Sequence, residues 1–167
     1  MLEKHKTIAK DIIDLAQEFG AEQVSVSLAN STSFQVDVRE QKIESLQESG
    51  SSGIHLTVSK NKRRSTVSSN DLRIETLAPL IRSTLQALPY MGIDEFYSLP
   101  DPKLQGRASI NLEFNDPDFD KLGSAEKVNI PLDLEKLSLD SDQRLRTDQA
   151  FYADSISYMV HADSNGF

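Results

Sequence analysis

The sequence predicts an α+β fold: an antiparallel β-meander sheet packed by helices, with a long proline-containing connection to a further helix and strand. Residues 34–68 predict the meander, because apolar and polar side chains alternate there with a period of two. Residues 3–19 predict a helix, because apolar side chains recur every three or four positions. Residues 88–122 predict the connection, because they hold four of the six prolines and show no lasting periodicity.

The amino-terminal segment is predicted to be a helix followed by a strand. Gly20 is a natural stop for the helix, since glycine accepts the left-handed conformation that follows a helix end. The strand is predicted over Gln23–Ala29, and Asn30–Thr32 is predicted to be the turn into the meander. Asn30–Thr32 also fits the N-glycosylation pattern, but without a secretory signal we interpret it as turn chemistry only.

Three strands with tight connections are predicted within residues 34–68. Polar turns are expected at Glu40–Lys42 and at Lys60–Lys62. Glu48–Gly53 is predicted to be a flexible connection between two strands, since it lacks the spacing and the lysine of a phosphate-binding loop. One face of this meander is expected to be buried and the other to face water.

A second helix is predicted between Asn70 and Ala87, with Asn70 or Asp71 as its cap. Pro79 lacks a backbone N–H and should kink a helix interior. Two interpretations stay open. Either the regular helix begins near Thr76 and holds Pro79 in its first turn, or it bends at Pro79.

A third helical segment and a last strand are predicted near the carboxyl end. The helix opens at Ser124 as its cap, is interrupted by Pro131, and ends at Asp140–Asp142. That Asp-x-Asp pair is also found in calcium loops, but the glycine and terminal glutamate of an EF-hand are absent, so a helix-ending turn is preferred. The last strand is predicted over Ala150–His161.

Changes in composition along the chain predict three parts. They are an amino-terminal α+β domain over 1–88, an extended connection over 89–122, and the start of a following domain over 123–167. The predicted core consists of apolar residues on the inner faces of these elements: Ile8, Ile12, Leu15, Val24, Val26, Val36, Val38, Ile54, Leu56, Val58, Leu77 and Ile81.

Composition excludes several classes of function. The net charge of −8 argues against broad binding to nucleic acid, and the densest basic run, Lys60–Arg64, is expected to be solvated at a hairpin tip. A nucleic-acid role for that run is the weaker alternative. The absence of cysteine removes disulfides and thiolate sites and fits a reducing cytoplasm. No apolar run is long enough to span a membrane and no apolar signal core follows Met1, so we expect a cytoplasmic protein.

No pattern of residues marks a reaction. His5, His55 and His161 are scattered, and none lies in a recognised metal-ligand spacing. His161 and Asp163 should face the same way on a strand, but the sequence marks no further ligand. There is no Gly-x-Ser-x-Gly elbow and no carboxylate pair in an apolar context. We therefore predict no catalytic and no metal residue, and the substrate-binding residues stay unknown.

Short motifs are spread along the whole chain. They are Phe19–Glu22, Val36–Arg39 with Ile43–Leu46, Gly53–Val58, Thr66–Leu72, Leu99–Pro102, Asn115–Pro117, Ser124–Lys127, Tyr152–Ser155 and Ser164–Phe167. In this shared order they resemble the amino-terminal region of the PmbA/TldD family, once called modulators of DNA gyrase. The Leu99–Pro102 segment and Asp142–Arg144 are more similar to the PmbA (TldE) branch. Gln41 and His55 depart from the family pattern where glycine is usual, and Arg73–Ile74 replaces Ser-Pro.

The resemblance implies a cytoplasmic zinc-dependent peptidase assembly of two related subunits that hydrolyses peptides or unfolded proteins. In the TldD branch of the family, a His-Glu-x-x-x-His zinc motif lies in a carboxy-terminal domain, and that motif is absent from these 167 residues. The resemblance therefore implies a piece of a longer protein, with the domain that starts over 123–167 truncated at its carboxyl end. We expect this piece to supply architecture, subunit contact and a wall of the substrate channel, with zinc held elsewhere. A sheet edge that binds an extended peptide is a further hypothesis.

Whether the chain is part of an enzyme is left open by its residues alone. The alternative function is a non-catalytic binding or adaptor module, for example a regulator linked to DNA gyrase. A third possibility is a family member that has lost catalysis, which the PmbA branch allows.

Overall fold

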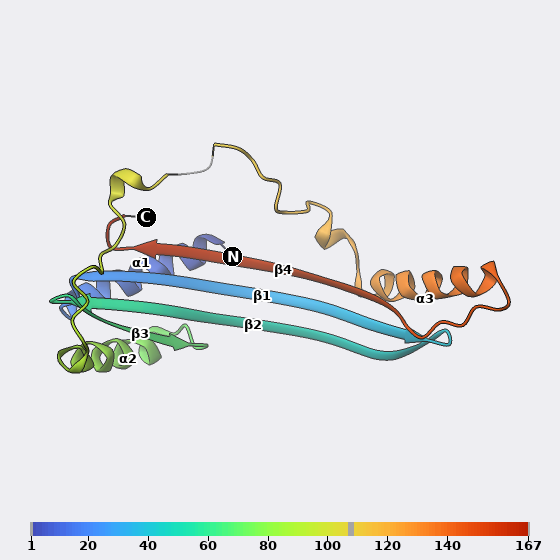
Figure 1. Cartoon of the computed structure of the whole chain (residues 1–167), viewed down its shortest axis with the longest axis horizontal. Coiled ribbons are helices and arrows are strands. Elements are labelled where there is room, and N and C mark those ends of the chain that lie inside the picture. Colours follow the sequence, from blue (N-terminus) through green and yellow to red (C-terminus); the bar gives the residue numbers. More distant parts are fainter. Residues whose placement is uncertain (1, 107–108, 167) are drawn as a thin grey trace. The chain divides into compact units, whose positions relative to one another are not determined.

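The computed structural model describes residues 2–106 and 109–166 (Figure 1). Met1, Phe167 at the end of the last family motif, and residues 107–108 of the predicted connection lie outside the described residues. The elements, in chain order, are α1 (Leu2–Glu18), β1 (Gln23–Arg39), β2 (Lys42–Lys60), β3 (Arg63–Ser69), α2 (Ile74–Ala87), η1 (Leu88–Tyr90), η2 (Pro102–Leu104), η3 (Phe119–Lys121), α3 (Ser124–Ser141) and β4 (Ala150–Asp163).

The strands form one four-stranded sheet in the order β3-β2-β1-β4 (Figure 1). β2 and β3 pair in antiparallel register from Ile54 opposite Ser69 to Lys60 opposite Arg63. The meander is therefore confirmed, and β4 returns beside β1 to complete the sheet. The predicted α+β class is confirmed as well.

Two predicted interruptions of the sheet are wrong. Asn30–Thr32 lies inside β1, and Glu48–Gly53 lies inside β2. Serine, asparagine and glycine favour turns locally, which is why these segments were predicted to be connections. In the sheet their hydroxyls find partners on the neighbouring strand, as in the 2.8 Å contact between Ser33 Oγ and Ser49 Oγ. Pairing with neighbours overrides local preference in strands.

The second helix begins between its two predicted starts, Asn70 and Thr76. α2 starts at Ile74, so Pro79 lies in the helix interior rather than in the first turn. Arg73 occupies the N-cap position without a side-chain cap, so the prediction of Asn70 or Asp71 as cap residue is wrong. Asp71 still serves the helix start, because its carboxylate accepts a hydrogen bond from the Thr76 hydroxyl at 2.8 Å.

The third helix also differs from the prediction at its start. Gly123, not Ser124, is the N-cap of α3, and its N–H donates to the Glu126 carboxylate at 2.6 Å. Pro131 lies inside α3 without ending it, since a proline removes only one of the helix hydrogen bonds. The helix ends at Ser141 as predicted.

The chain divides into two compact units, and each is described by itself. Unit 1 comprises Met1–Ser31, Ser51–Arg107 and Ser157–Phe167, and unit 2 comprises Thr32–Gly50 and Ala108–Ile156. In unit 1, apolar side chains of α1 and α2 pack against one face of the sheet. In unit 2 a smaller core forms around three β1 residues, Phe34, Val36 and Val38, with Val128, Leu132 and Tyr152 packed against them.

Ten of the twelve predicted core residues are buried. Ile8 and Leu15 are half-buried on α1 and pack at the margin of the unit 1 core. The predicted boundaries at residues 88 and 122 stay a prediction, although the segment between them contains only short 3₁₀ turns among its described residues.

Candidate functional site

The face of the unit 1 sheet opposite the helices carries hydroxyls and imidazoles. Ser27 Oγ lies 2.9 Å from His161 Nδ1, and Ser68 Oγ lies 2.8 Å from His55 Nδ1. The hydroxyls of Thr57 and Thr66 form a third cross-strand pair at 2.8 Å. We call this set the hydroxyl face. It is the polar side that the alternation predicted, and His55 lies on it as expected.

The serine–histidine pairs of the hydroxyl face have the distance of a nucleophile and its base. His55 and His161 are both exposed, however, and each pair joins adjacent strands on an open sheet surface. Exposed hydroxyls and imidazoles of this kind can bind polar groups of a ligand, because they both donate and accept hydrogen bonds.

The third histidine, His5, and Asp163, the residue predicted to share a strand face with His161, lie on different elements. His5 is buried on α1, at 7% exposure, and Asp163 is buried on β4. The Asp163 carboxylate accepts hydrogen bonds from the Gln105 side chain at 3.1 Å and from the Asn165 N–H at 2.8 Å. Within residues 2–106 and 109–166, no three side chains of histidine, aspartate or glutamate gather where they could hold a metal ion. The described donors therefore do not fit a zinc site.

The basic run Lys60–Arg64 forms the hairpin between β2 and β3 and is partly neutralised. The Arg64 guanidinium lies 3.4 Å from the Asp94 carboxylate and 4.6 Å from the centre of the Tyr97 ring. Arg63 donates through Nε to the Met91 carbonyl at 3.0 Å. These contacts direct two of the cations toward the chain itself, which disfavours the nucleic-acid alternative.

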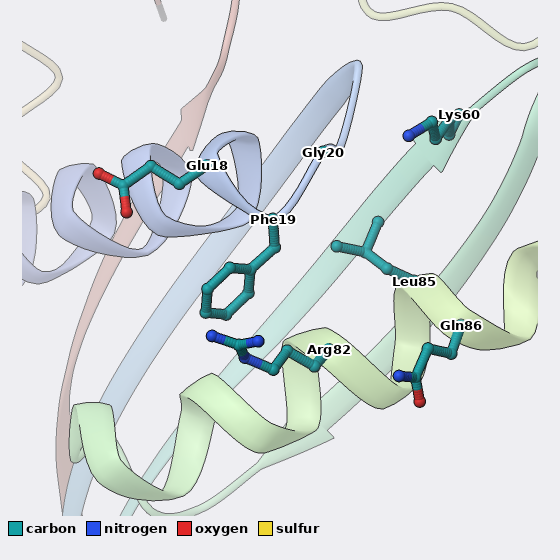
Figure 2. Close-up of a pocket in the computed structure, with 7 residues that line it drawn as sticks. All are labelled: Glu18, Phe19, Gly20, Lys60, Arg82, Leu85 and Gln86. Carbon is teal, nitrogen blue, oxygen red and sulfur yellow. The ribbon is translucent and has the colours of Figure 1, made fainter.

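A hollow of about 650 Å³ opens where α1 ends, and we call it the α1-end hollow (Figure 2). It exists because α1 stops abruptly. Gly20 takes a left-handed φ of 97°, its N–H donates to the Gln17 carbonyl, and the Ala21 N–H donates to the Ala16 carbonyl. This pair of bonds is the Schellman ending that the glycine predicted. The lining residues come from the last residue of α1, the two residues after it, β2 and α2: Glu18, Phe19, Gly20, Lys60, Arg82, Leu85 and Gln86.

Two cations face the α1-end hollow. The Arg82 guanidinium lies 3.9 Å from the centre of the Phe19 ring, directly beside it in Figure 2. Lys60 Nζ lies 3.1 Å from where a Cβ at Gly20 would stand. Among the described residues neither cation forms an ion pair or a hydrogen bond. The sequence did not reveal this site, because its residues come from three segments with no common motif.

Unit 2 has a buried carboxylate at the β1–β2 turn. Glu135 of α3 is fully buried and accepts the N–H groups of Glu40 at 2.9 Å and Gln41 at 2.7 Å. The Thr147 hydroxyl donates to the same carboxylate at 2.6 Å. The bond from Thr147, followed by the one from the Gln41 backbone, lowers the pKa of Glu135 from its ordinary value. This carboxylate is satisfied by the turn and has a structural role.

A second polar group in unit 2 is the ion pair of Lys127 and Asp154, 2.6 Å apart at 11% and 15% exposure. Tyr152 donates its hydroxyl to Asp154 at 2.7 Å. Burial, reinforced by that bond, raises the pKa of Tyr152 to about 12, so the phenol stays protonated as a donor. Lys127 also lies 5.3 Å from the centre of the Phe34 ring, which ties the pair to the small core.

The predicted helix-ending turn at Asp140–Asp142 is confirmed. The Asp142 carboxylate accepts the Arg144 N–H at 2.8 Å and pairs with its guanidinium at 2.6 Å.

Along the described stretches of the chain, no helix combines the length and apolar character needed to cross a membrane.

Comparison with solved structures shows the fold. A candidate modulator of DNA gyrase from Bacteroides thetaiotaomicron superposes with a TM-score of 0.84 at 24% identity, over 98% of this chain and 37% of that one. TldE from Thermococcus kodakarensis superposes with a TM-score of 0.77 at 17% identity, over 95% of this chain and 35% of that one. At these identities the similarity establishes the architecture alone.

Comparison of sequences adds the family. The chain is 25% identical over 146 residues to a protein named metalloprotease PmbA homolog from Buchnera aphidicola, a match that covers 87% of this chain and 32% of that protein. The chain thus spans about a third of the length of this relative. Residues 24–88 match the profile of PmbA/TldA metallopeptidase domain 1. These residues therefore form a domain of the PmbA/TldD metallopeptidase domain 1 family.

Proposed function

We propose that this chain is the amino-terminal part of a PmbA/TldD-like zinc-dependent peptidase assembly that acts on peptides or unfolded proteins. The observation that carries the proposal is the match of residues 24–88 to the first metallopeptidase domain of the family. The metalloprotease name of the Buchnera relative supports the same activity. The proposal includes a related family subunit as partner and the cytoplasm as location.

Within that assembly the chain provides structural support and contacts the related subunit and the peptide substrate. The described residues do not fit a zinc site, so the metal belongs to another part of the assembly. The hydroxyl face suits a wall beside an extended peptide, because serine and threonine hydroxyls both donate to and accept from backbone amides. Such contacts recognise the main chain and not particular side chains, as a peptidase for unfolded proteins requires.

The outer edge of β2 offers a second mode of peptide contact. β3 pairs only with the Ile54–Lys60 part of β2, and residues 42–50 have no strand neighbour on that side within the described chain. Both faces of this segment are exposed, including Ile43 and Leu46 at 50% each. Open edges of this kind accept an added strand.

The activity is tested on the intact protein purified together with its related subunit. We expect stoichiometric zinc by elemental analysis and hydrolysis of unfolded casein, with both removed by a chelator. A pair that contains zinc but leaves casein and short peptides intact would favour a family member without catalysis. A pair with neither property, from which DNA gyrase is nonetheless recovered, would overturn the proposal in favour of an adaptor.

The strand-addition mode is tested separately by amide hydrogen exchange. Saturation with an extended substrate peptide should slow exchange of β2 amides in residues 42–50. If the peptide leaves amide exchange across residues 23–67 unchanged, peptide binding by strand addition is contradicted. The zinc and hydrolysis results would still decide the activity.

A further inference from the structure

We propose that the α1-end hollow binds the free α-carboxylate of a peptide whose last side chain is apolar. The inference rests on the proposed function in taking a peptide as the ligand. The hollow is large enough for one terminal residue and its neighbour, and it belongs entirely to unit 1. It is separate from the hydroxyl face, because its residues come from the helical side of the sheet.

The charges of the α1-end hollow carry the inference. In a chain of net charge −8, Lys60 and Arg82 lie in one hollow, with no anionic partner among the described residues. Three of the other arginines with printed contacts, Arg64, Arg73 and Arg144, each pair with an aspartate. Glu18 lines the rim, but its carboxylate points away from both cations in Figure 2.

The position of Arg82 prepares it for an anion. Stacking beside Phe19 occupies one face of the guanidinium and leaves its N–H edge free. That edge can hold both oxygens of a carboxylate at once. A lysine beside the end of a helix is explained by the helix dipole alone, but the dipole does not explain the second cation on α2.

The walls of the α1-end hollow select the kind of anion. Phe19 and Leu85 offer apolar surface next to the cations, and the Gln86 amide offers a donor and an acceptor for a peptide group. The carboxyl end of α1 carries negative partial charge, which disfavours a doubly charged phosphate more than a singly charged carboxylate. A peptide end with an apolar last side chain satisfies all three requirements.

Gly20 brings the backbone of the turn after α1 close to Lys60. A Cβ there would stand 3.1 Å from Lys60 Nζ, so the end of this flexible side chain would have to shift by a few tenths of an ångström.

The test measures binding and does not depend on hydrolysis. Fluorescein-labelled Ala-Ala-Phe with a free carboxylate is titrated with the intact protein and followed by fluorescence anisotropy. The matched probe is the same peptide with a carboxy-terminal amide. We expect the amide to bind at least about tenfold more weakly, since it lacks the charge that the two cations recognise. Equal binding of the two peptides would overturn the inference.

Variants locate the binding. The double substitution K60M/R82M should weaken binding of the free carboxylate by about tenfold or more and leave the weak binding of the amide unchanged. The control is K62M, which removes a cation of the same hairpin that does not line the hollow. Circular dichroism melting verifies that each variant folds, and R82K offers a milder change should the double variant unfold. Full binding by folded K60M/R82M, or displacement of the peptide by equimolar inorganic phosphate, would contradict the proposal.

The outcomes separate this inference from the proposed function. Carboxylate-specific binding without zinc or hydrolysis would leave the inference standing and the peptidase proposal overturned. Hydrolysis by the assembly, together with equal binding of the free-carboxylate and amide peptides, would overturn this inference and leave the peptidase proposal standing.

Discussion

Glu135 shows how one side chain supports an unfavourable turn. Glu40 and Gln41 both take left-handed φ values, 52° and 57°, which cost energy for residues other than glycine. The buried carboxylate of Glu135 holds both of their N–H groups. Gln41 stands at a turn position where glycine is usual in the family. The acceptor that Glu135 provides explains why the turn forms without glycine.

We predict that E135Q lowers the melting temperature at neutral pH by about 5 °C. The amide that replaces one oxygen faces donors and leaves at least one buried N–H unsatisfied. The control is D133N on the exposed side of the same helix, which should leave the melting temperature unchanged. An equal fall of the melting temperature in E135Q and D133N would show that the charge of the helix, and not support of the turn, causes the effect.

The pH dependence of stability follows from the same group. The pKa of Glu135 is lowered from 4.5, chiefly by the Thr147 hydroxyl, so its ionised form stabilises the folded chain. That contribution is complete above 4.5 and is lost as the pH falls from 4.5 through the lowered pKa. Melting temperatures from pH 7 to pH 3 should therefore fall more steeply for the parent than for E135Q. Parallel curves would count against this assignment.

The ion pair of Lys127 and Asp154 gives a second prediction for single residues. D154N preserves the shape but leaves Lys127 without its partner at 11% exposure, which should cost on the order of 3 kcal/mol in urea unfolding. The matched control is D118N, which breaks an ion pair exposed at 73% and 65% and should cost less than about 1 kcal/mol. The double variant K127M/D154N should recover part of the loss, because no charge is left unpaired.

At the level of elements, the two hairpins use left-handed residues at both turn positions. In the β2–β3 turn, Asn61 and Lys62 have φ values of 51° and 56°. Asparagine tolerates this conformation, but lysine does not favour it, and Asn-Gly is the preferred pair for such a turn. We predict that K62G stabilises the chain by about 0.5 to 1 kcal/mol in urea unfolding. The control K42G, inside β2, should destabilise the chain. A loss of stability in both K62G and K42G would contradict the prediction.

The elements themselves were predictable to different degrees. Periodicity located α1 and β4, because a regular spacing of apolar residues survives in any context, whereas polar residues at both ends located α3. The lengths of β1 and β2 were missed, because their central serines and glycines form strand only through cross-strand bonds such as Ser31 to Ser157. The start of α2 at Ile74 was missed, because Asp71 supports the helix from outside the cap position.

At the scale of the whole molecule, most of the apolar packing lies in the larger of two cores. Ile12 is fully buried in that core, so I12A should cost about 2 to 5 kcal/mol in urea unfolding. Ile43 has the same chemistry but is 50% exposed, so I43A should cost less than about 1.5 kcal/mol. Similar losses from both variants would mean that the exposed edge of β2 is covered in solution.

The sequence by itself determined the α+β class, the meander, most of the core and the family resemblance, because each of these depends on local periodicity or on motifs in order. Only the tertiary structure decided the continuous long strands, the satisfied carboxylate of Glu135 and the α1-end hollow with Lys60 and Arg82. The physical reason is that these features arise between residues far apart in the chain. Their hydrogen bonds, stacking and unpaired charges exist only after the segments meet.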